Sequence, residues 1–119
     1  MTMNHTYFIT GISTEVGKTL TSAIMVEALE ADYWKPIQSG DKHASDTMKV
    51  QSLISNSRTR FFPSSYAFDY PASPHLSAQM EGVIIEKDKI IRPVTDRPLV
   101  IEAAGGLFVP LNDQTDGRA

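Results

Sequence analysis

The segment Gly11–Thr19, which reads GISTEVGKT, restricts the fold of this chain more than any other feature. It follows a β-branched and aromatic run, Thr6–Thr10, that suits a buried strand, and it precedes apolar residues whose spacing predicts a helix over about Lys18–Leu29. Glycines let the backbone approach phosphates, a helix start supplies unpaired N–H groups, and the lysine and threonine supply a cation and a Mg²⁺ ligand. Five residues separate the glycines, one more than in the usual motif, so we expect a longer phosphate-binding loop.

The remaining segments continue an alternation of strands and helices. We expect, in order, a strand at Ala31–Pro36, a helix from Ser45 or Asp46, a helix from Ser73-Pro74 and a strand at Leu99–Ile101. Ser55–Pro74 has no helical period and reads as loop with at most one short strand, near Tyr66–Phe68. This alternation predicts a three-layer α/β/α P-loop fold with a mostly parallel sheet.

The composition indicates one soluble domain over residues 1–119, with 41% hydrophobic and 21% charged residues and a net charge of -3. The chain has no cysteine, which excludes thiolate metal sites and cysteine nucleophiles. It has no basic cluster of the kind that binds nucleic acid. It also has no apolar run of membrane-spanning length and no signal peptide. We therefore expect a cytoplasmic protein that acts on small molecules.

Two carboxylates are candidate Mg²⁺ ligands. Glu102 ends the predicted strand at Leu99–Ile101, and open parallel sheets bind ligands beyond the carboxyl ends of their strands. It is either a metal ligand or a salt-bridged strand end. Asp46 stands at a predicted helix start, where an aspartate is commonly only a cap, so both a capping and a metal-binding role stay open.

Lys35 lies in Trp34–Gly40, WKPIQSG, at the carboxyl end of the second predicted strand. A second cation on this rim would stabilise the charge that develops during phosphoryl transfer, and a solvated lysine is the alternative. The histidines share no metal-ligand spacing, and the serines considered as nucleophiles have no nearby histidine. These residues are His5, His43 and His75, and Ser13, Ser22 and Ser39.

Taken together, these motifs resemble those of the dethiobiotin synthetases. The matching segments are Thr10–Thr19, Trp34–Gly40, Ser45-Asp46, Ser73–His75 and Ile101–Gly106. The longer phosphate-binding loop and the Lys-Pro-x-x-Ser-Gly strand are marks of that family. The resemblance implies ATP-, Mg²⁺- and CO₂-dependent closure of the ureido ring of dethiobiotin on 7,8-diaminopelargonate, through a carbamate and a carbamic-phosphoric anhydride. Another P-loop ligase, such as a cobyrinic acid amide synthetase, and a non-catalytic ATP-binding switch are the alternatives.

The resemblance also implies roles for individual residues. The implied ATP-binding residues are Glu15, Val16, Gly17, Lys18, Thr19, Leu20, Asp46, Glu102, Ala103, Ala104 and Gly105. Thr19, Asp46 and Glu102 would hold Mg²⁺. Lys18 and Lys35 would bind the carbamate and the transferring phosphate as catalytic residues, and Ser39 the substrate's amino or carbamate end. Where the family commonly has Glu-Gly-Ala-Gly-Gly, this chain has Glu102-Ala-Ala-Gly-Gly106.

The resemblance extends from about Tyr7 to Asp113 and covers only the first half of a family member. We therefore expect a truncated domain, without the adenine-reading loop and without the homodimer contacts that hold the substrate carboxylate. Such a domain should leave the strand at Leu99–Ile101 with an unpaired edge. We also expect that strand and Leu107–Val109 to lack part of their packing.

Overall fold

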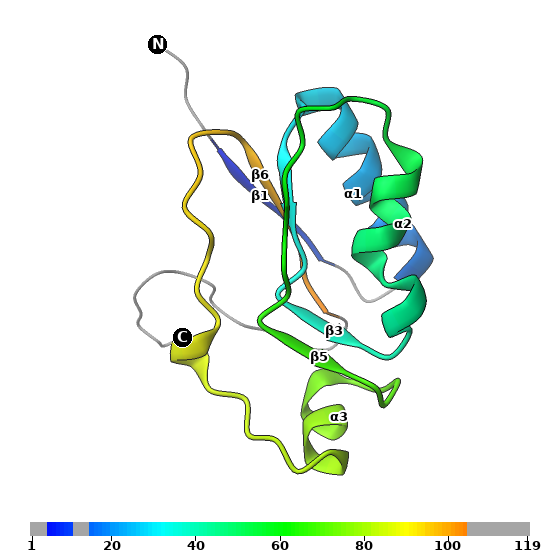
Figure 1. The fold of residues 1–119 in the computed structure, drawn as a ribbon, viewed down its shortest axis with the longest axis vertical. Helices are drawn as coiled ribbons and strands as arrows, with labels where there is room; N and C mark the ends of the chain where they lie inside the picture. The colour runs from blue at the N-terminus through cyan, green and yellow to red at the C-terminus, as the bar shows by residue number, and fades with distance from the viewer. Residues whose placement is uncertain (1–4, 11–14, 105–119) are drawn as a thin grey trace.

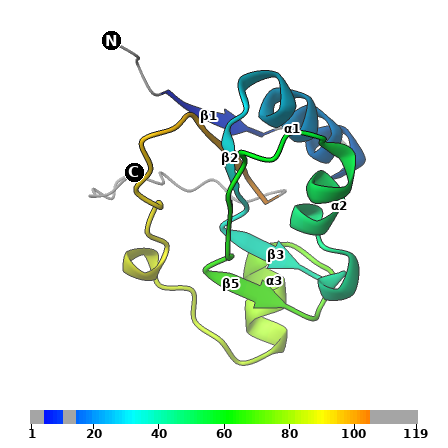
Figure 2. The same ribbon diagram turned by 45° about the horizontal axis from the view of Figure 1, so that its top comes forward.

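The structure, a computed structural model, describes residues 5–10 and 15–104. Its larger sheet has the strand order β1-β6-β2-β4, and a smaller sheet pairs β3 with β5 (Figures 1 and 2). The strands are β1 (Thr6–Ile9), β2 (Asp32–Trp34), β3 (Ile37–Ser39), β4 (Phe61–Phe62), β5 (Tyr66–Phe68) and β6 (Leu99–Glu102). Every strand pairing among the described residues is parallel, which confirms the predicted α/β class.

Two helices, α1 and α2, lie side by side on one face of the larger sheet (Figure 1). The helices of the described chain are α1 (Glu15–Leu29), α2 (Asp46–Leu53) and α3 (Pro74–Met80), with 3₁₀ turns η1 (Lys42–Ala44) and η2 (Lys87–Lys89). Val26 of α1 and Val50 of α2 pack with Tyr33 and Val100 of the sheet in one buried apolar cluster. This cluster fixes α1 and α2 against β2 and β6.

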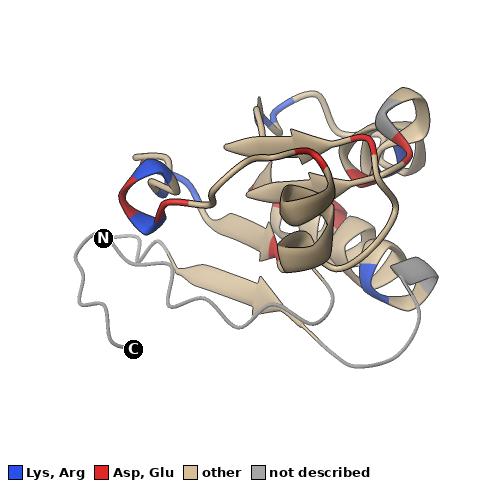
Figure 3. Ribbon diagram, turned by 90° about the horizontal axis from the view of Figure 1, so that it is seen from below, with Lys and Arg blue, Asp and Glu red and all other residues tan. Residues whose placement is uncertain are grey.

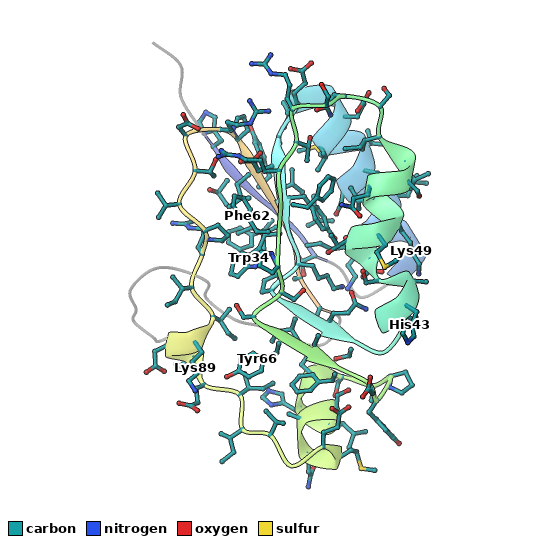
Figure 4. All side chains as sticks on the ribbon, viewed as in Figure 1. Trp34, His43, Lys49, Phe62, Tyr66 and Lys89 are labelled. Atoms are coloured by element: carbon teal, nitrogen blue, oxygen red, sulfur yellow. The ribbon has the colours of Figure 1, made fainter. Side chains whose placement is uncertain are left out.

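On the opposite face, side chains of the larger sheet join a second buried cluster with residues of the smaller sheet, of α3 and of the extended chain around η2, while α3 itself packs against the smaller sheet (Figures 1 and 2). Trp34 and Ile101 point to this side because side chains alternate along a strand, and they pack with Ala78 of α3 and with Ile90. Figure 4 shows Trp34 and Phe62 between the strands and the segment that leads from η2 to β6. One face of the larger sheet thus carries two helices, and the other packs against extended chain and against the smaller sheet with its helix.

The predicted capping serine, Ser73, is confirmed, and Ser45 caps α2 in the same way. The Ser45 side chain accepts a hydrogen bond from the Met48 N–H at 3.2 Å, and the Ser73 side chain accepts one from the Leu76 N–H at 3.4 Å. A serine oxygen at this position satisfies an N–H that has no partner inside the helix. Pro74 follows as the first residue of α3, where its missing N–H has no cost.

One expectation about strands is wrong, and another is confirmed with narrower bounds. Residues 55–74 contain two strands, because β4 pairs with β2 in addition to the predicted β5. Two residues are too few to show a period in the sequence. The second predicted strand is also shorter than expected, since β2 ends at Trp34 and the chain enters β3 after Pro36.

The expected unpaired edge at Leu99–Ile101 is also wrong. β6 lies between β1 and β2, so that Val100 is the register partner of both Tyr7 and Tyr33. Residues 99–101 are fully packed, with exposed fractions of 2% or less. The reason is a crossover that inserts the last described strand between the first two. Leu107–Val109 lie outside the described residues.

Candidate functional site

The candidate site lies at the carboxyl ends of β2 and β6. Tyr33 and Val100 face α1 and α2, and residues two positions further along a strand face the same side. The same alternation brings Lys35 and Glu102 to this side, where their charged groups lie 3.6 Å apart. Two neighbouring parallel strands therefore deliver a cation and a carboxylate to one edge of the sheet.

Glu102 is fully buried and has a partner for each carboxylate oxygen. Its Oε2 accepts a hydrogen bond from the Thr19 hydroxyl at 3.0 Å and is the atom nearest to Lys35. Its Oε1 accepts a hydrogen bond from the Tyr33 hydroxyl at 2.8 Å. Glu102 is thus ion-paired and also hydrogen-bonded to Thr19, the last residue of the predicted phosphate-binding segment Gly11–Thr19.

Lys35 and Asp46 form a buried ion pair. Lys35 is 2% exposed and its Nζ lies 2.6 Å from Asp46 Oδ2, so the interpretation of Lys35 as a solvated lysine is wrong. Asp46 is the first residue of α2, but the cap is Ser45, and the Asp46 carboxylate is directed at Lys35 instead. The capping interpretation of Asp46 is therefore wrong as well.

The two carboxylates differ in acidity. Burial raises the pKa of Asp46, but the charge and hydrogen bond of Lys35 outweigh burial and hold that pKa below its usual range. Burial also raises the pKa of Glu102. The charge of Lys35 opposes this, but burial together with the nearby Asp46 carboxylate outweighs Lys35, so that pKa lies above its usual range. Asp46 is the more readily ionised of the pair.

Lys18 connects the start of α1 to the residue that follows β6. The Lys18 side chain is buried, and its Nζ donates a hydrogen bond to the Ala103 carbonyl at 3.2 Å. Ala103 is held in turn by its N–H, which donates to the Ile9 carbonyl at 2.9 Å. A pocket of about 320 Å³ opens here. It is lined by Phe8, Ile9, Thr10, Gly17, Lys18 and Thr21.

Ser39 ends β3 with a buried hydroxyl that has no hydrogen-bond partner among the described residues. A buried hydroxyl without a partner is costly, so this atom is suited to a ligand. The Ser22 hydroxyl on α1 is in the same condition. Both hydroxyls are exceptions to the usual pairing of buried polar groups. Ser39 is the one of the two that was predicted to bind substrate, and it remains a candidate for that role.

Two further residues near the site were not predicted, Tyr33 and Gln38. The Gln38 side chain donates to the Gly40 carbonyl at 3.0 Å and accepts from the Asp46 N–H at 3.2 Å. It thereby ties the start of α2 to β3. The alternation of side chains along the strand places Tyr33 on the same side as Lys35, which was the available signal.

The remaining predicted ATP-binding residues are placed only in part. Leu20 is half exposed on α1, and Ala104 is partly buried against the cluster that contains Trp34. Glu15 and Val16 are the first residues of α1, but the structure does not describe their side chains. Ser13 and Gly105 lie outside the described residues. The structure therefore brings together Lys18, Thr19, Lys35, Asp46, Glu102 and Ala103.

The donors at this edge suit a hard divalent cation. The part of the chain that the structure describes has no group of three or more His, Cys, Asp and Glu side chains able to hold a metal. The candidate set is instead two carboxylates, Asp46 and Glu102, with the Thr19 hydroxyl. Such oxygen donors fit Mg²⁺, which keeps several waters or phosphate oxygens among its ligands.

Charges elsewhere are mixed in sign. Figure 3 shows both signs on η2, where Lys89 lies 3.5 Å from Glu86 and Asp88 stands between two lysines. The lysines of η2 thus do not form a uniformly basic surface. In the described ranges no helix is both long enough and apolar enough to cross a membrane.

Comparison with known proteins gives close relatives along nearly the whole chain. The ATP-dependent dethiobiotin synthetase BioD of Christiangramia forsetii is 56% identical over 110 residues, which are 92% of this chain and 53% of that protein. The enzyme of the same name from Brucella anthropi is 50% identical over 113 residues, 95% of this chain and 53% of that protein. The chain thus spans about half the length of these curated relatives, and the matched half is the N-terminal one.

A protein-family model described as an AAA domain matches residues 5–116. This match includes the phosphate-binding segment and every strand and helix described above. The chain belongs to this AAA domain family, and the relatives it resembles there are dethiobiotin synthetases.

Proposed function

We propose that this protein acts in biotin biosynthesis as an ATP-dependent dethiobiotin synthetase, with ATP, CO₂ and 7,8-diaminopelargonate as substrates. One observation carries the proposal: two lysines, a threonine and two carboxylates from separate segments meet at one edge of the sheet, beside the start of α1. Phosphoryl transfer depends on positioning and charge stabilisation, which such a group provides. The names of the relatives support the same reaction.

The first part of the proposal concerns the nucleotide. Lys18 and the N–H groups at the start of α1 would bind the β- and γ-phosphates. Lys18 would exchange its contact with the Ala103 carbonyl for a phosphate oxygen. Thr19, Asp46 and Glu102 would hold Mg²⁺, which when bound neutralises charge on the phosphate oxygens.

The second part concerns the substrate. One amine of diaminopelargonate would add CO₂ to form a carbamate, and a carbamate oxygen would attack the γ-phosphorus and release ADP. The second amine would then attack the carbamate carbon, closing the ring and releasing phosphate. Lys35, whose charge is fixed by Asp46 and Glu102, would stabilise the negative charge in transit, and the unpaired Ser39 hydroxyl would bind the amino or carbamate end.

The proposal includes a homodimer, which the family resemblance implies, and the cytoplasmic location that we expect from the sequence. Turnover is tested on the longest polypeptide that contains this sequence, with ATP, Mg²⁺, diaminopelargonate and ¹³C-labelled bicarbonate. Mass spectrometry should detect dethiobiotin that carries one ¹³C atom, with equimolar ADP. Formation of ADP without labelled dethiobiotin would contradict the proposed reaction and favour an ATP-binding switch or another ligase.

Lys35→Gln tests the role of the second lysine. Because its contact with the transferring group is made mainly in the transition state, the variant should lose at least about 100-fold in turnover while ATP affinity changes little. Lys89→Gln is the matched control, since Lys89 is an exposed lysine paired with Glu86 on η2. Equal turnover in Lys35→Gln and Lys89→Gln would remove Lys35 from the catalytic residues.

A further inference from the structure

Tyr33 lies beside the candidate metal site without belonging to it. Its side chain is completely buried on the face that α1 and α2 cover, and its ring lies 5.9 Å from the ring of Phe61. From there its hydroxyl donates a hydrogen bond to Glu102 Oε1 at 2.8 Å. The ring is thus part of the apolar core, and the hydroxyl reaches a candidate ligand.

The hydroxyl, unlike the ring, is not needed to fill this space. The neighbours of the Tyr33 ring in the cluster include Val26, Val50 and Val100, against which a phenylalanine ring would pack equally well. Burying a hydroxyl in apolar surroundings is unfavourable unless it forms a hydrogen bond. Here the Glu102 carboxylate accepts that hydrogen bond, so the hydroxyl acts on Glu102.

This contact makes the two oxygens of Glu102 unequal. Oε1 is occupied by Tyr33, whereas Oε2 faces the Thr19 hydroxyl and the Lys35 ammonium group. A free carboxylate rotates about its last bond, but this one is held by hydrogen bonds at both oxygens. The result is one defined oxygen on the side of the phosphate-binding segment.

We propose that Tyr33 is a positioning residue for Glu102: it holds the carboxylate so that Oε2 stays directed towards Thr19 and the divalent cation. This inference rests on the proposed function, because it assigns Glu102 to the metal. Hydrogen bonds to a ligand from outside the coordination sphere orient the ligand and commonly account for about 10- to 100-fold in metal affinity.

The test is binding of Mn²⁺ alone, followed by the electron paramagnetic resonance signal of the free ion, in the wild-type chain and in Tyr33→Phe. We expect Tyr33→Phe to weaken binding by about 10-fold or more. Tyr66→Phe is the matched control. It also removes a hydroxyl with one hydrogen bond, from the Glu86 N–H at 3.0 Å, but away from the site, and it should bind Mn²⁺ as the wild type does. Equal affinity in Tyr33→Phe and wild type would overturn the inference.

Glu102→Leu separates failure of this inference from failure of the proposed function. If Glu102→Leu binds Mn²⁺ as well as the wild type, Glu102 is not a ligand and the metal site of the proposed function is wrong. If Glu102→Leu weakens binding but Tyr33→Phe does not, only the role of Tyr33 is wrong.

The double variant Tyr33→Phe/Glu102→Leu covers the case in which Tyr33→Phe alone does not fold. It replaces both partners of the hydrogen bond by apolar groups, which leaves no buried polar atom unpaired between them. If Tyr33 acts through Glu102, the double variant binds Mn²⁺ no more weakly than Glu102→Leu. A further loss in the double variant would show that Tyr33 acts by another route and would overturn the inference.

Discussion

Gly40 determines how the chain turns from β3 towards α2. Its φ of +73° lies in the left-handed region, and a Cβ at this position would lie 2.7 Å from Pro71 Cβ and 2.8 Å from Pro71 Cα. The Gly40 N–H also donates to the Phe68 carbonyl at 2.7 Å, which fixes the backbone in place. The turn that carries Asp46 to Lys35 therefore requires glycine for both conformation and space.

Gly40→Ala should destabilise the protein by about 2 kcal/mol or more, of which roughly 1 kcal/mol is the left-handed conformation and the rest the collision with Pro71. Gly82→Ala is the control, because Gly82 has a similar φ of +69° but no described atom within 4 Å of the added Cβ. Urea unfolding of both variants measures the difference. Equal losses at the two positions would show that the contact with Pro71 is not limiting.

At the residue scale, the site residues that belong to a local sequence motif could be predicted. The contacts between residues far apart in the sequence could not. Lys18 and Thr19 follow from the phosphate-binding segment, because its chemistry is local in sequence. The Tyr33 contact with Glu102 joins residues 69 positions apart and depends on β6 lying next to β2. No local pattern contains that information.

At the scale of elements, Glu27 links α1 to the segment that follows α2. Its carboxylate accepts hydrogen bonds from the backbone and side chains of Ser55 and Asn56, at 2.5 to 3.1 Å. The side-chain hydrogen bonds of Ser55 and then Asn56, followed by the backbone bonds, lower the pKa of Glu27 from 4.5 to about 2. The ionised form is therefore the one that stabilises the fold.

Because the folded-state pKa of Glu27 is lowered, its contribution is fully present above pH 4.5 and is lost as the pH falls towards about 2. The difference in unfolding free energy between wild type and Glu27→Gln should therefore shrink as the pH is lowered from 7 to 3. Urea unfolding across this range measures it. A difference that stays constant down to pH 3 would contradict the assigned hydrogen bonds.

Helices that are marked by neighbouring residues in the sequence were predicted. The short strand β4, which no local pattern marks, was missed. Both serine-capped helices were located to within a residue because a cap is a contact between near neighbours in sequence. β4 was missed because its two residues are defined only by pairing with β2. The strand at β5 was predicted, but its pairing with β3 joins distant segments and has no local signal.

At the scale of the whole molecule, buried charge is concentrated at the two ends of β2. At the amino end Asp32 is buried and is held by Thr95 at 2.6 Å, by Arg60 at 2.9 Å and by Arg97 at 3.2 Å. Burial raises the pKa of Asp32, but the hydrogen bonds of Thr95 and Arg60 and the charge of Arg60 outweigh it and lower that pKa. This cluster joins β2 to the segments that precede β4 and β6.

The charged group at the carboxyl end of β2 has a different composition. There Lys35 lies between two carboxylates, one of which, Asp46, is the first residue of α2. Lys35 is shared by Asp46 and Glu102, and the pKa of Glu102 stays raised. Because burial disfavours the charged form of Glu102, a divalent cation bound at this end would stabilise its ionised carboxylate, as the proposed Mg²⁺ site requires.

The central claim is that this end of the molecule binds the phosphates of a nucleotide, and calorimetric titration with ATP and Mg²⁺ tests it most directly. Lys18→Gln removes the cation assigned to the phosphates, whereas Lys89→Gln removes an exposed lysine of η2. We predict that Lys89→Gln binds as the wild type does and that Lys18→Gln loses about 2 kcal/mol, or roughly 30-fold in Kd. The same affinity for Mg·ATP in wild type and Lys18→Gln would contradict the account.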